Sequence, residues 1–297
     1  MHDIKKIREN PSDLDELLAK RKHPPVSNQI IELDEKNREI IGELQVIQEE
    51  RNTKSKLIGE YAANGKNDEA AKLKAEVASL KDKMQDLENS QREKQEELNT
   101  VLSSLPNNPA DDVPVGDESL NKEIKLEGNK KEFSFNPKEH DELGENLNMM
   151  SFEQAAKISG ARFVVQSGLI ARMERAISNF MLDLHTNEFG YTEMNVPILV
   201  KDQSVYGVGQ LPKFKDDLFK TTDDYWLIPT AEVPLSNMTW ESIIDILDLP
   251  KRYVSHTPCF RSEAGAAGKD TRGMIRQHQF SKIEMVSIVH PKDSDSK

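Results

Sequence analysis

The amino-acid sequence predicts an α+β protein, in which an antiparallel coiled-coil hairpin of two long helices precedes an antiparallel sheet with flanking helices. Three features support this fold class. Apolar residues recur every seven positions between residues 28 and 105, a proline-rich segment ends that pattern, and short alternating strands follow it.

Composition narrows the classes of protein before any motif is considered. The 297 residues carry a net charge of -12, which argues against broad, charge-driven nucleic-acid binding and leaves binding through a local patch open. No apolar run approaches the roughly 18 residues of a membrane span, and the N-terminus lacks a secretory signal. A single cysteine excludes a disulfide framework. We therefore expect a cytoplasmic protein with no membrane contact and no metal-binding side chains.

The first half of the chain predicts two long helices joined by a turn. Asn64 and Gly65 suit that turn, because both residue types tolerate positive φ. The apolar columns are Leu33, Ile40, Ile47 and Tyr61 beside Ile30, Leu44 and Ile58, then Ala70, Val77, Met84, Leu98 and Leu105 beside Leu73, Leu80, Leu87 and Val101. A short turn brings the two helices back alongside each other, so we expect an arm about 50 Å long.

Polar residues interrupt this register and surround it. The polar register positions are Asn37, Arg51, Lys54, Gln91 and Lys94. We expect their side chains to reach water at a thin two-helix seam rather than to bind a ligand. The exposed basic residues of the arm favour a solvated face over a phosphate track: Lys54, Lys56, Lys66, Lys72 and Lys74. Before the arm, residues 3–23 predict short helices that break at Asn10-Pro11.

A proline-rich segment separates the arm from the rest of the chain. Prolines 106, 109 and 114 cannot continue a helix, which predicts a domain boundary near residue 105. We expect a helical arm at 1–105, a linker at 106–118 and a second domain at 119–297. Within that domain, residues 167–189 predict a helix that stops at Gly190, and strands are expected within 191–200, 225–228 and 276–289. The apolar face of that helix contains Leu169, Ile170, Met173, Ile177, Phe180, Met181 and Leu184.

Polar chemistry concentrates between residues 258 and 284. Two extended pieces flank a loop rich in Gly and Ala and predict a β-hairpin. Alternation puts five side chains of the second strand on one face: Arg276, His278, Phe280, Lys282 and Glu284. With Arg261 and Glu263 on the first strand, this face offers a guanidinium for a phosphate, a ring for a base and a carboxylate for an amine. From spacing alone, a polar face that merely contacts water is favoured about as much as a binding site.

Other segments carry less information. Gly265–Asp270 superficially resembles a P-loop, but Asp270 stands where that motif needs a hydroxyl residue after Lys269. Thr230-Ala231-Glu232, taken alone, favours a proline-bounded turn with Glu232 in water. Cys259 has no partner base, so covalent catalysis is not indicated.

Together these segments resemble the bacterial-type seryl-tRNA synthetases, a family of class II aminoacyl-tRNA synthetases. The resemblance covers nearly the whole chain and rests on the helical hairpin and five further segments: Asp111–Gly116, Gly160–Phe163, Gly209–Phe214, Thr230–Glu232 and Phe260–Phe280. Residues 167–197 match the first class motif, which implies a homodimer formed through them. Residues 258–284 match the second class motif, within a class II catalytic domain.

The resemblance implies an activity with its substrates. L-serine would be activated with ATP to seryl-adenylate and transferred to tRNA(Ser), with Mg²⁺ as a further cofactor and the helical arm holding the tRNA. Arg261 would be the catalytic residue, at the ATP α-phosphate. The ATP-binding residues would be Arg261, Ser262, Glu263, Arg276, Gln277 and Phe280, with Glu263 at the adenine end and Phe280 stacked on the base. The serine-binding residues would be Thr230, Ala231, Glu232 and Glu284, whose division between the ammonium and the hydroxyl stays open.

The chain departs from the family pattern at its end. The family continues to a third class motif whose arginine contacts the ATP γ-phosphate, whereas this sequence stops at Ser296-Lys297. We therefore expect a C-terminally truncated catalytic domain that is inactive as it stands. The alternative function is a non-catalytic coiled-coil module that binds RNA or protein beside an incomplete ATP-binding domain.

Overall fold

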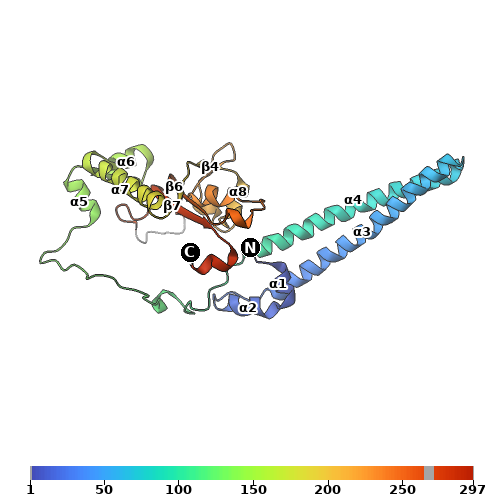
Figure 1. The fold of residues 1–297 in the computed structure, drawn as a ribbon, viewed down its shortest axis with the longest axis horizontal. Coiled ribbons are helices and arrows are strands. Elements are labelled where there is room, and N and C mark those ends of the chain that lie inside the picture. Colours follow the sequence, from blue (N-terminus) through green and yellow to red (C-terminus); the bar gives the residue numbers. More distant parts are fainter. Residues whose placement is uncertain (1, 264–270, 297) are drawn as a thin grey trace. The chain divides into compact units, whose positions relative to one another are not determined.

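The computed structural model describes residues 2–263 and 271–296, and the chain divides into two compact units, Met1–Glu127 and Gly128–Lys297 (Figure 1). The first unit contains α1 (Ile4–Glu9), α2 (Pro11–Ala19), α3 (Ser27–Ala63), α4 (Asn67–Ser104) and the short 3-10 helix η1 (Glu118–Leu120). The two long helices lie side by side and antiparallel, which confirms the predicted hairpin. At 1.5 Å per residue, the 37 residues of α3 span about 55 Å.

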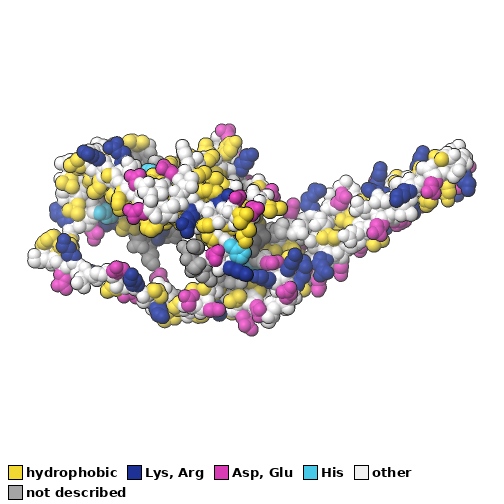
Figure 2. Space-filling view, viewed as in Figure 1, with side chains coloured by type: hydrophobic (Ala, Val, Ile, Leu, Met, Phe, Trp, Pro, Cys, Tyr) yellow, Lys and Arg dark blue, Asp and Glu magenta, His cyan; other side chains and the backbone are white. Residues whose placement is uncertain are grey.

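The seam between α3 and α4 follows the seven-residue register. Ile30, Ala70, Met84, Leu98 and Leu105 are buried, and the remaining apolar register positions are half-buried. Gly65 takes φ +71° in the turn, where a side chain would be strained. The seam therefore buries only one narrow stripe of each helix, and both signs of charge are distributed along the hairpin surface (Figure 2).

One polar register position does not behave as the sequence predicts. Asn37 is 4% exposed and does not reach water. Its amide donates to Gln95 Oε1 at 2.9 Å and accepts from Gln91 Nε2 at 3.3 Å. The partners across the seam satisfy the amide, so burial is tolerated, and a buried amide network of this kind favours one register of the two helices. Lys54 instead pairs with Glu50 and, across the seam, with Glu76.

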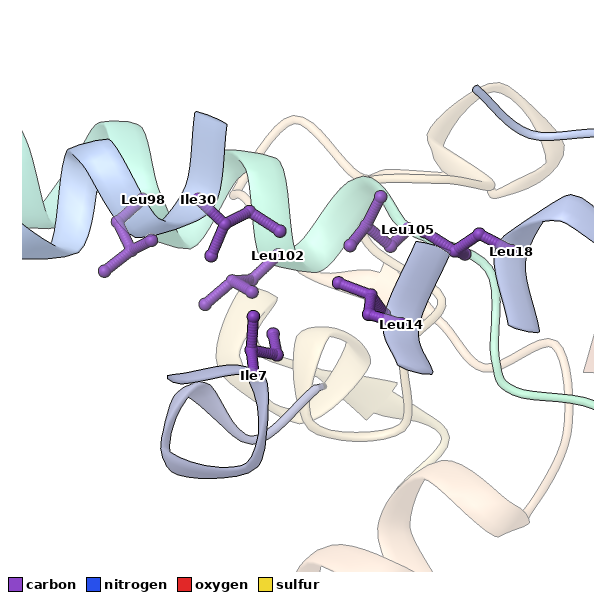
Figure 3. Close-up of a cluster of buried hydrophobic side chains, with 7 residues drawn as sticks. All are labelled: Ile7, Leu14, Leu18, Ile30, Leu98, Leu102 and Leu105. Atoms are coloured by element: carbon purple, nitrogen blue, oxygen red, sulfur yellow. The ribbon is translucent and has the colours of Figure 1, made fainter. Parts of the chain in front are cut away.

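The two short helices close the base of the arm. Figure 3 shows their side chains directed at the ends of α3 and α4. The buried cluster contains Ile7, Leu14, Leu18, Ile30, Leu98, Leu102 and Leu105. Full burial of each such side chain contributes about 2 kcal/mol. Arg8 adds a bidentate contact to Asp34, with Nε and Nη2 at 2.7 and 2.8 Å from the carboxylate oxygens.

The N-terminus of α3 is capped from α2 rather than by its own flanking residue. Val26 precedes the helix and has no capping side chain. Asp15 accepts instead from the backbone amides of Val26 and Ser27, at 2.8 and 3.1 Å, and from the Ser27 hydroxyl. This carboxylate satisfies helix donors that otherwise have no partner within the helix.

The second unit carries the sheet. Its helices are α5 (His140–Asn146), α6 (Phe152–Ser159), α7 (Gly168–Asn187), α8 (Asp202–Gly207) and α9 (Glu232–Asn237), with 3-10 turns η2 (Lys215–Asp217), η3 (Ile246–Asp248) and η5 (Pro291–Ser296). Its strands are β1 (Met150–Ser151), β2 (Val165–Gln166), β3 (Thr192–Glu193), β4 (Leu199–Val200), β5 (Trp226–Leu227), β6 (Lys251–Phe260) and β7 (Gln279–Ile288).

The largest sheet has the order β3-β6-β7. The predicted fold class is confirmed, with one difference in topology. β6 and β7 are antiparallel as expected, but β3 pairs with β6 in parallel, through Thr192↔Tyr253 and Glu193↔Val254. The sheet is therefore mixed, because the chain reaches β6 from β3 by a long crossover instead of a hairpin.

The helix α7 leaves most of its predicted apolar face uncovered. Ser178 and Leu182 are its buried residues, whereas Leu169, Met173, Ile177 and Phe180 are 52–65% exposed. Figure 2 shows hydrophobic side chains gathered over α6 and α7. An apolar face of this size on a helix favours a contact with another surface.

Other segments bear on the predicted domain limits. Residues 105–139 contain no helix or strand besides η1, so the irregular stretch is longer than the predicted linker at 106–118. The division into an arm at 1–105, that linker and a domain at 119–297 stays a prediction. None of the described helices combines the length and the apolar character needed to cross a bilayer.

Replacing the capping carboxylate should loosen the start of α3. We expect Asp15→Ala to lower the free energy of unfolding of the first unit by about 1 kcal/mol, a typical cost of losing a helix N-cap. Hydrogen exchange of the amides of residues 26–29 and thermal unfolding followed by circular dichroism measure the effect. Glu16→Ala on the same helix is the control, because Glu16 is exposed, and equal behaviour of the two variants would contradict the capping role.

The same carboxylate makes this segment sensitive to acid. Burial raises the pKa of Asp15, but hydrogen bonds from Ser27 and Val26 outweigh it and hold the pKa below its ordinary value. Because the pKa is lower in the folded state, the contribution is complete above the unfolded value of about 3.9 and is lost as pH falls through the folded value. Amide protection of residues 26–29 should therefore decrease below about pH 4 in the parent and change less in Asp15→Ala.

Candidate active site

The β6–β7 hairpin forms the floor of the candidate site. Ten residue pairs join the strands, ending at Phe260↔Gln279. The hairpin predicted from residues 258–284 is confirmed, although β6 begins earlier, at Lys251. Residues 261–278 connect the two strands, and the structure does not describe residues 264–270 of this connection, so the segment Gly265–Asp270 that resembles a P-loop lies outside the described residues.

Arg261 leaves the end of β6 with its backbone and side chain both held. Its amide donates to His278 O at 2.9 Å, which continues the strand pairing by one residue. Its Nε donates to Pro229 O at 3.2 Å, and its guanidinium carbon lies 5.1 Å from the centre of the Phe280 ring. A guanidinium held in this way by a carbonyl and an aromatic face is preorganised to contact a ligand.

Arg261 opens into a cavity of about 340 Å³. Its walls come from four separate segments of the second unit, and the lining residues are Gln210, Phe214, Asp217, Leu218, Pro229, Arg261, Glu263 and Arg276. Three of the predicted ATP-binding residues thus share one cavity. Phe280 does not line this cavity, but its ring contacts Arg261, which does.

Glu263 is held on both its backbone and its carboxylate. It adopts φ +51°, which is unusual for a residue with a side chain. Its carbonyl accepts from Arg162 Nη1 at 3.1 Å, and its carboxylate accepts from Arg276 Nη1 at 3.0 Å. These two arginines stabilise a backbone conformation that would otherwise be unfavourable.

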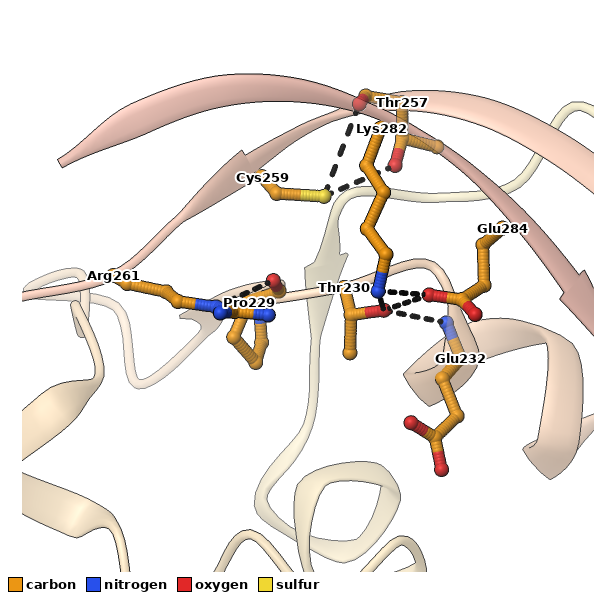
Figure 4. A network of polar contacts seen from close by, with 8 residues as sticks. All are labelled: Pro229, Thr230, Glu232, Thr257, Cys259, Arg261, Lys282 and Glu284. Carbon is orange, nitrogen blue, oxygen red and sulfur yellow. Dashed lines mark hydrogen bonds and ion pairs between the residues drawn. The ribbon is translucent and has the colours of Figure 1, made fainter. Parts of the chain in front are cut away.

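A second polar group lies beside this cavity, one residue after Pro229 (Figure 4). Thr230 is 3% exposed, and its hydroxyl donates to Glu284 Oε2 in a short hydrogen bond. It accepts from Lys282 Nζ at 3.1 Å and from the Glu232 amide at 3.4 Å. Lys282 Nζ also lies 2.5 Å from Glu284 Oε2. Every hydrogen-bonding position of the hydroxyl is therefore used.

The remaining predicted site residues take different places. Ser262 donates its amide to Asp217 O at 2.8 Å, which ties the end of β6 to η2. Gln277 is 5% exposed, donates to Gly273 O, and does not line the 340 Å³ cavity. Ala231 is fully buried, so only its backbone faces polar groups. Glu232 is exposed, and Figure 4 shows its carboxylate pointing away from Glu284.

Sequence reasoning did not assign roles to several residues of the site. Gln210 and Phe214 line the cavity from a segment that only the family resemblance singled out, and Asp217, three residues after that segment, was not singled out at all. Lys282 was placed on the polar face by strand alternation, but alternation does not show that it meets Thr230. His278 was placed on the same face, yet its ring packs against Phe163 and Phe219, at centroid distances of 5.4 and 5.9 Å.

The start of α5 supports the segment that returns from the loop to β7. His140 Nε2 accepts from the Met274 amide at 2.8 Å, and Asp141 accepts from Arg272 Nε at 2.9 Å. The hydrogen bond from Arg272 holds the pKa of Asp141 below its ordinary value. Gly273 has φ +60°, and a Cβ there would lie 2.2 Å from His140 Nε2, so no larger residue fits without moving the His140 side chain.

Cys259 is fully buried, and burial raises the pKa of its thiol, which suits a packed side chain rather than a nucleophile. Across residues 2–263 and 271–296, no group of three or more His, Cys, Asp or Glu side chains is arranged to hold a metal ion.

Comparison with known proteins identifies relatives for both units. The family model described as the seryl-tRNA synthetase N-terminal domain matches residues 1–109. The model described as the tRNA synthetase class II core domain (G, H, P, S and T) matches residues 213–297. The serine–tRNA ligases of Brucella canis and Brucella suis are each 58% identical over 295 residues, which cover 99% of this chain and 69% of each relative.

Solved structures show the same likeness. The seryl-tRNA synthetase from Pyrococcus horikoshii complexed with ATP superimposes with a TM-score of 0.84 at 34% identity, covering 100% of this chain and 71% of that one. The cytoplasmic serine–tRNA ligase from Naegleria fowleri in complex with AMP gives a TM-score of 0.76 at 27% identity, covering 97% and 69% of the two chains.

Proposed function

This chain belongs to the seryl-tRNA synthetase family, and on that premise we propose how its residues carry out the reaction. The function is ATP-dependent activation of serine followed by charging of tRNA. The main support for this assignment of the site is that the adjacent residues Pro229 and Thr230 connect the cavity to the second polar group. Pro229 anchors Arg261 beside the cavity, and Thr230 anchors the polar group that contains Glu284.

The first step needs a phosphate and an amino-acid carboxylate in contact. The serine carboxylate attacks the α-phosphorus of ATP, the bond to the β-phosphate oxygen breaks, and pyrophosphate leaves. Arg261 would neutralise the charge that grows on the α-phosphate oxygens. The site thus acts by positioning and electrostatics, without a covalent enzyme intermediate.

The nucleotide would occupy the cavity lined by Arg261, Glu263 and Arg276. Phe280, whose ring also contacts Arg261, would stack on adenine beside this cavity, Glu263 would offer a carboxylate to the adenine amino group, and Ser262 would fix the chain between Arg261 and Glu263. Gln277 would act through Gly273, since its side chain is turned to that carbonyl. Mg²⁺ would arrive bound to the ATP phosphates, because it commonly keeps its waters and needs few protein ligands.

Serine would bind at the second polar group. Thr230, Glu232 and Glu284 surround the start of α9, and the buried Ala231 contributes only backbone. A site built to hydrogen-bond a hydroxyl rejects alanine, because its buried acceptors would stay unpaired. L-serine is therefore the substrate that this group would select.

The arm would bind tRNA(Ser), outside the ATP and serine sites. Lys56, Lys72 and Lys74 on its surface are exposed, and they are candidates for phosphate contacts. Lys54 is a weaker candidate because it already pairs with Glu50 and Glu76. A cytoplasmic location, as expected from the sequence, would place the protein with its tRNA substrate.

A homodimer would form through residues 167–197. The exposed apolar face of α7 supports this proposal, because a symmetric pairing buries the same face on both copies. The residues that would meet there are Leu169, Met173, Ile177 and Phe180.

Removing the guanidinium tests the nucleotide site. In the product of the whole gene, Arg261→Ala should lower serine-dependent exchange between ATP and pyrophosphate by at least about 100-fold, because preorganised charge stabilisation contributes about 3 kcal/mol. Arg92→Ala, an exposed arginine on α4, is the matched control and should exchange normally. Exchange by Arg261→Ala within a few-fold of the parent would contradict the assignment.

Shortening the arm separates activation from charging. The contacts of Asn37 with Gln95 and of Lys54 with Glu76 show that residues 45 and 85 lie about opposite each other in the two helices. In the shortened variant, a tight turn replaces residues 45–85, and the buried base of the arm stays intact. Seryl-adenylate formation should persist, and tRNA charging should be lost, with binding that weakens steeply in salt. The same turn inserted only in place of residues 64–66 is the control. Parallel loss of both activities would show a structural role.

A negative charge introduced on the exposed apolar face of α7 tests the proposed dimer. Phe180→Glu should convert dimers to monomers in sedimentation experiments, since burying an unpaired carboxylate at an interface is strongly unfavourable. Phe135→Glu provides the control, because Phe135 is equally exposed, at 63% against 64%, and lies outside α7. A dimer that persists in Phe180→Glu would refute this interface.

A further inference from the structure

Lys282 has no assigned role, yet it lies at the centre of the proposed serine site (Figure 4). It projects from the middle of β7, two residues before Glu284, so strand alternation puts both side chains on one face. Its ammonium is 2.5 Å from Glu284 Oε2 and 3.1 Å from Thr230 Oγ1. One cation therefore contacts both Glu284 and Thr230 at the proposed serine site.

The hydrogen bonds fix which carboxylate oxygen remains for a ligand. Glu284 Oε2 accepts from both Thr230 and Lys282. Among the residues that the structure describes, none donates a hydrogen bond to Glu284 Oε1. This oxygen is also not one of the buried side-chain atoms that lack a hydrogen-bond partner. With Oε2 held at two points, the carboxylate cannot rotate, and Oε1 is presented in one direction.

The two glutamates of the site differ in whether a nearby cation compensates their negative charge. Lys282 neutralises Glu284, whose side chain is 17% exposed. The Glu232 carboxylate makes no ion pair within the described part of the chain and is exposed. A neutralised carboxylate suits a neutral hydroxyl donor, and an uncompensated one attracts a cation.

We propose that Lys282 is a positioning residue for substrate specificity, an inference that rests on the proposed function. The Lys282 ammonium holds Glu284 Oε2 and the Thr230 hydroxyl in place. Glu284 Oε1 then points to the hydroxyl of serine, and Glu232 binds the ammonium group of serine. Selection of serine over alanine then depends on a lysine that does not itself contact the hydroxyl.

The test compares Lys282→Met with a matched lysine elsewhere in the sheet. Met keeps the length and apolar stem but removes the charge. Lys251→Met is the control, because Lys251 also lies on a strand of this sheet, is 29% exposed against 35%, and pairs with an aspartate. Both variants are made in the product of the whole gene, and the exchange between ATP and pyrophosphate is measured with serine and with alanine.

In Lys282→Met, we expect the KM for serine to rise at least about 10-fold and the preference for serine over alanine to fall by a similar factor, because the hydroxyl acceptor is no longer held. The KM for ATP should stay within about threefold of the parent, and Lys282→Arg should recover most of the preference, since it restores a cation. Lys251→Met should match the parent in every measurement.

Three results would overturn the inference. An unchanged preference for serine in Lys282→Met would show that Glu284 needs no clamp. A joint rise of both KM values with a lowered thermal midpoint would show a structural role, and a loss of kcat alone would place Lys282 at the reacting carboxylate. If the parent shows no serine-dependent exchange, the proposed function itself fails, whatever the lysine variants do.

Discussion

The pairing of β6 with β7 is the constraint on which the candidate site depends. Ten consecutive residue pairs fix the register, and the side-chain period of two then sends Phe280, Lys282 and Glu284 to the same face. A slip of one residue would turn all three to the opposite face. Val254, Ser255 and Cys259 are fully buried on β6, so packing opposes such a slip. The chemistry of the site is thus set by a backbone interaction.

Most charged side chains of the site are held in place before any ligand arrives, and Glu232 is the exception. Arg261 rests on Phe280 and on Pro229 O, Glu263 pairs with Arg276, and Glu284 pairs with Lys282. Groups that are already oriented need little reorganisation when charge develops during a reaction. The three pairs divide the site into a nucleotide side and an amino-acid side, which meet at Pro229-Thr230. Glu232 is the exposed member of this group.

The arm follows a different physical plan. A cluster of seven buried residues and the Arg8–Asp34 contact make its base rigid. Farther out, the seam relies on half-buried side chains, on the buried Ala70 and Met84, and on the buried amide of Asn37. Two helices alone have no deep core, so most of their surface faces water and is available for contacts. Such a design suits recognition of an extended partner better than catalysis.

Local periodicity in the sequence determined the helices of the arm, the turn at Gly65, the extent of α7 and the β6–β7 hairpin, because each depends on residues that are close in the chain. The tertiary structure alone decided which segments meet. Thr230 and Glu284 are 54 positions apart, Pro229 and Arg261 are 32 apart, and no periodic pattern encodes either contact. The parallel pairing of β3, the burial of Asn37 and the exposure of the apolar face of α7 were also decided there. Burial and pairing depend on what packs against a residue, and a periodic pattern specifies only which side it occupies.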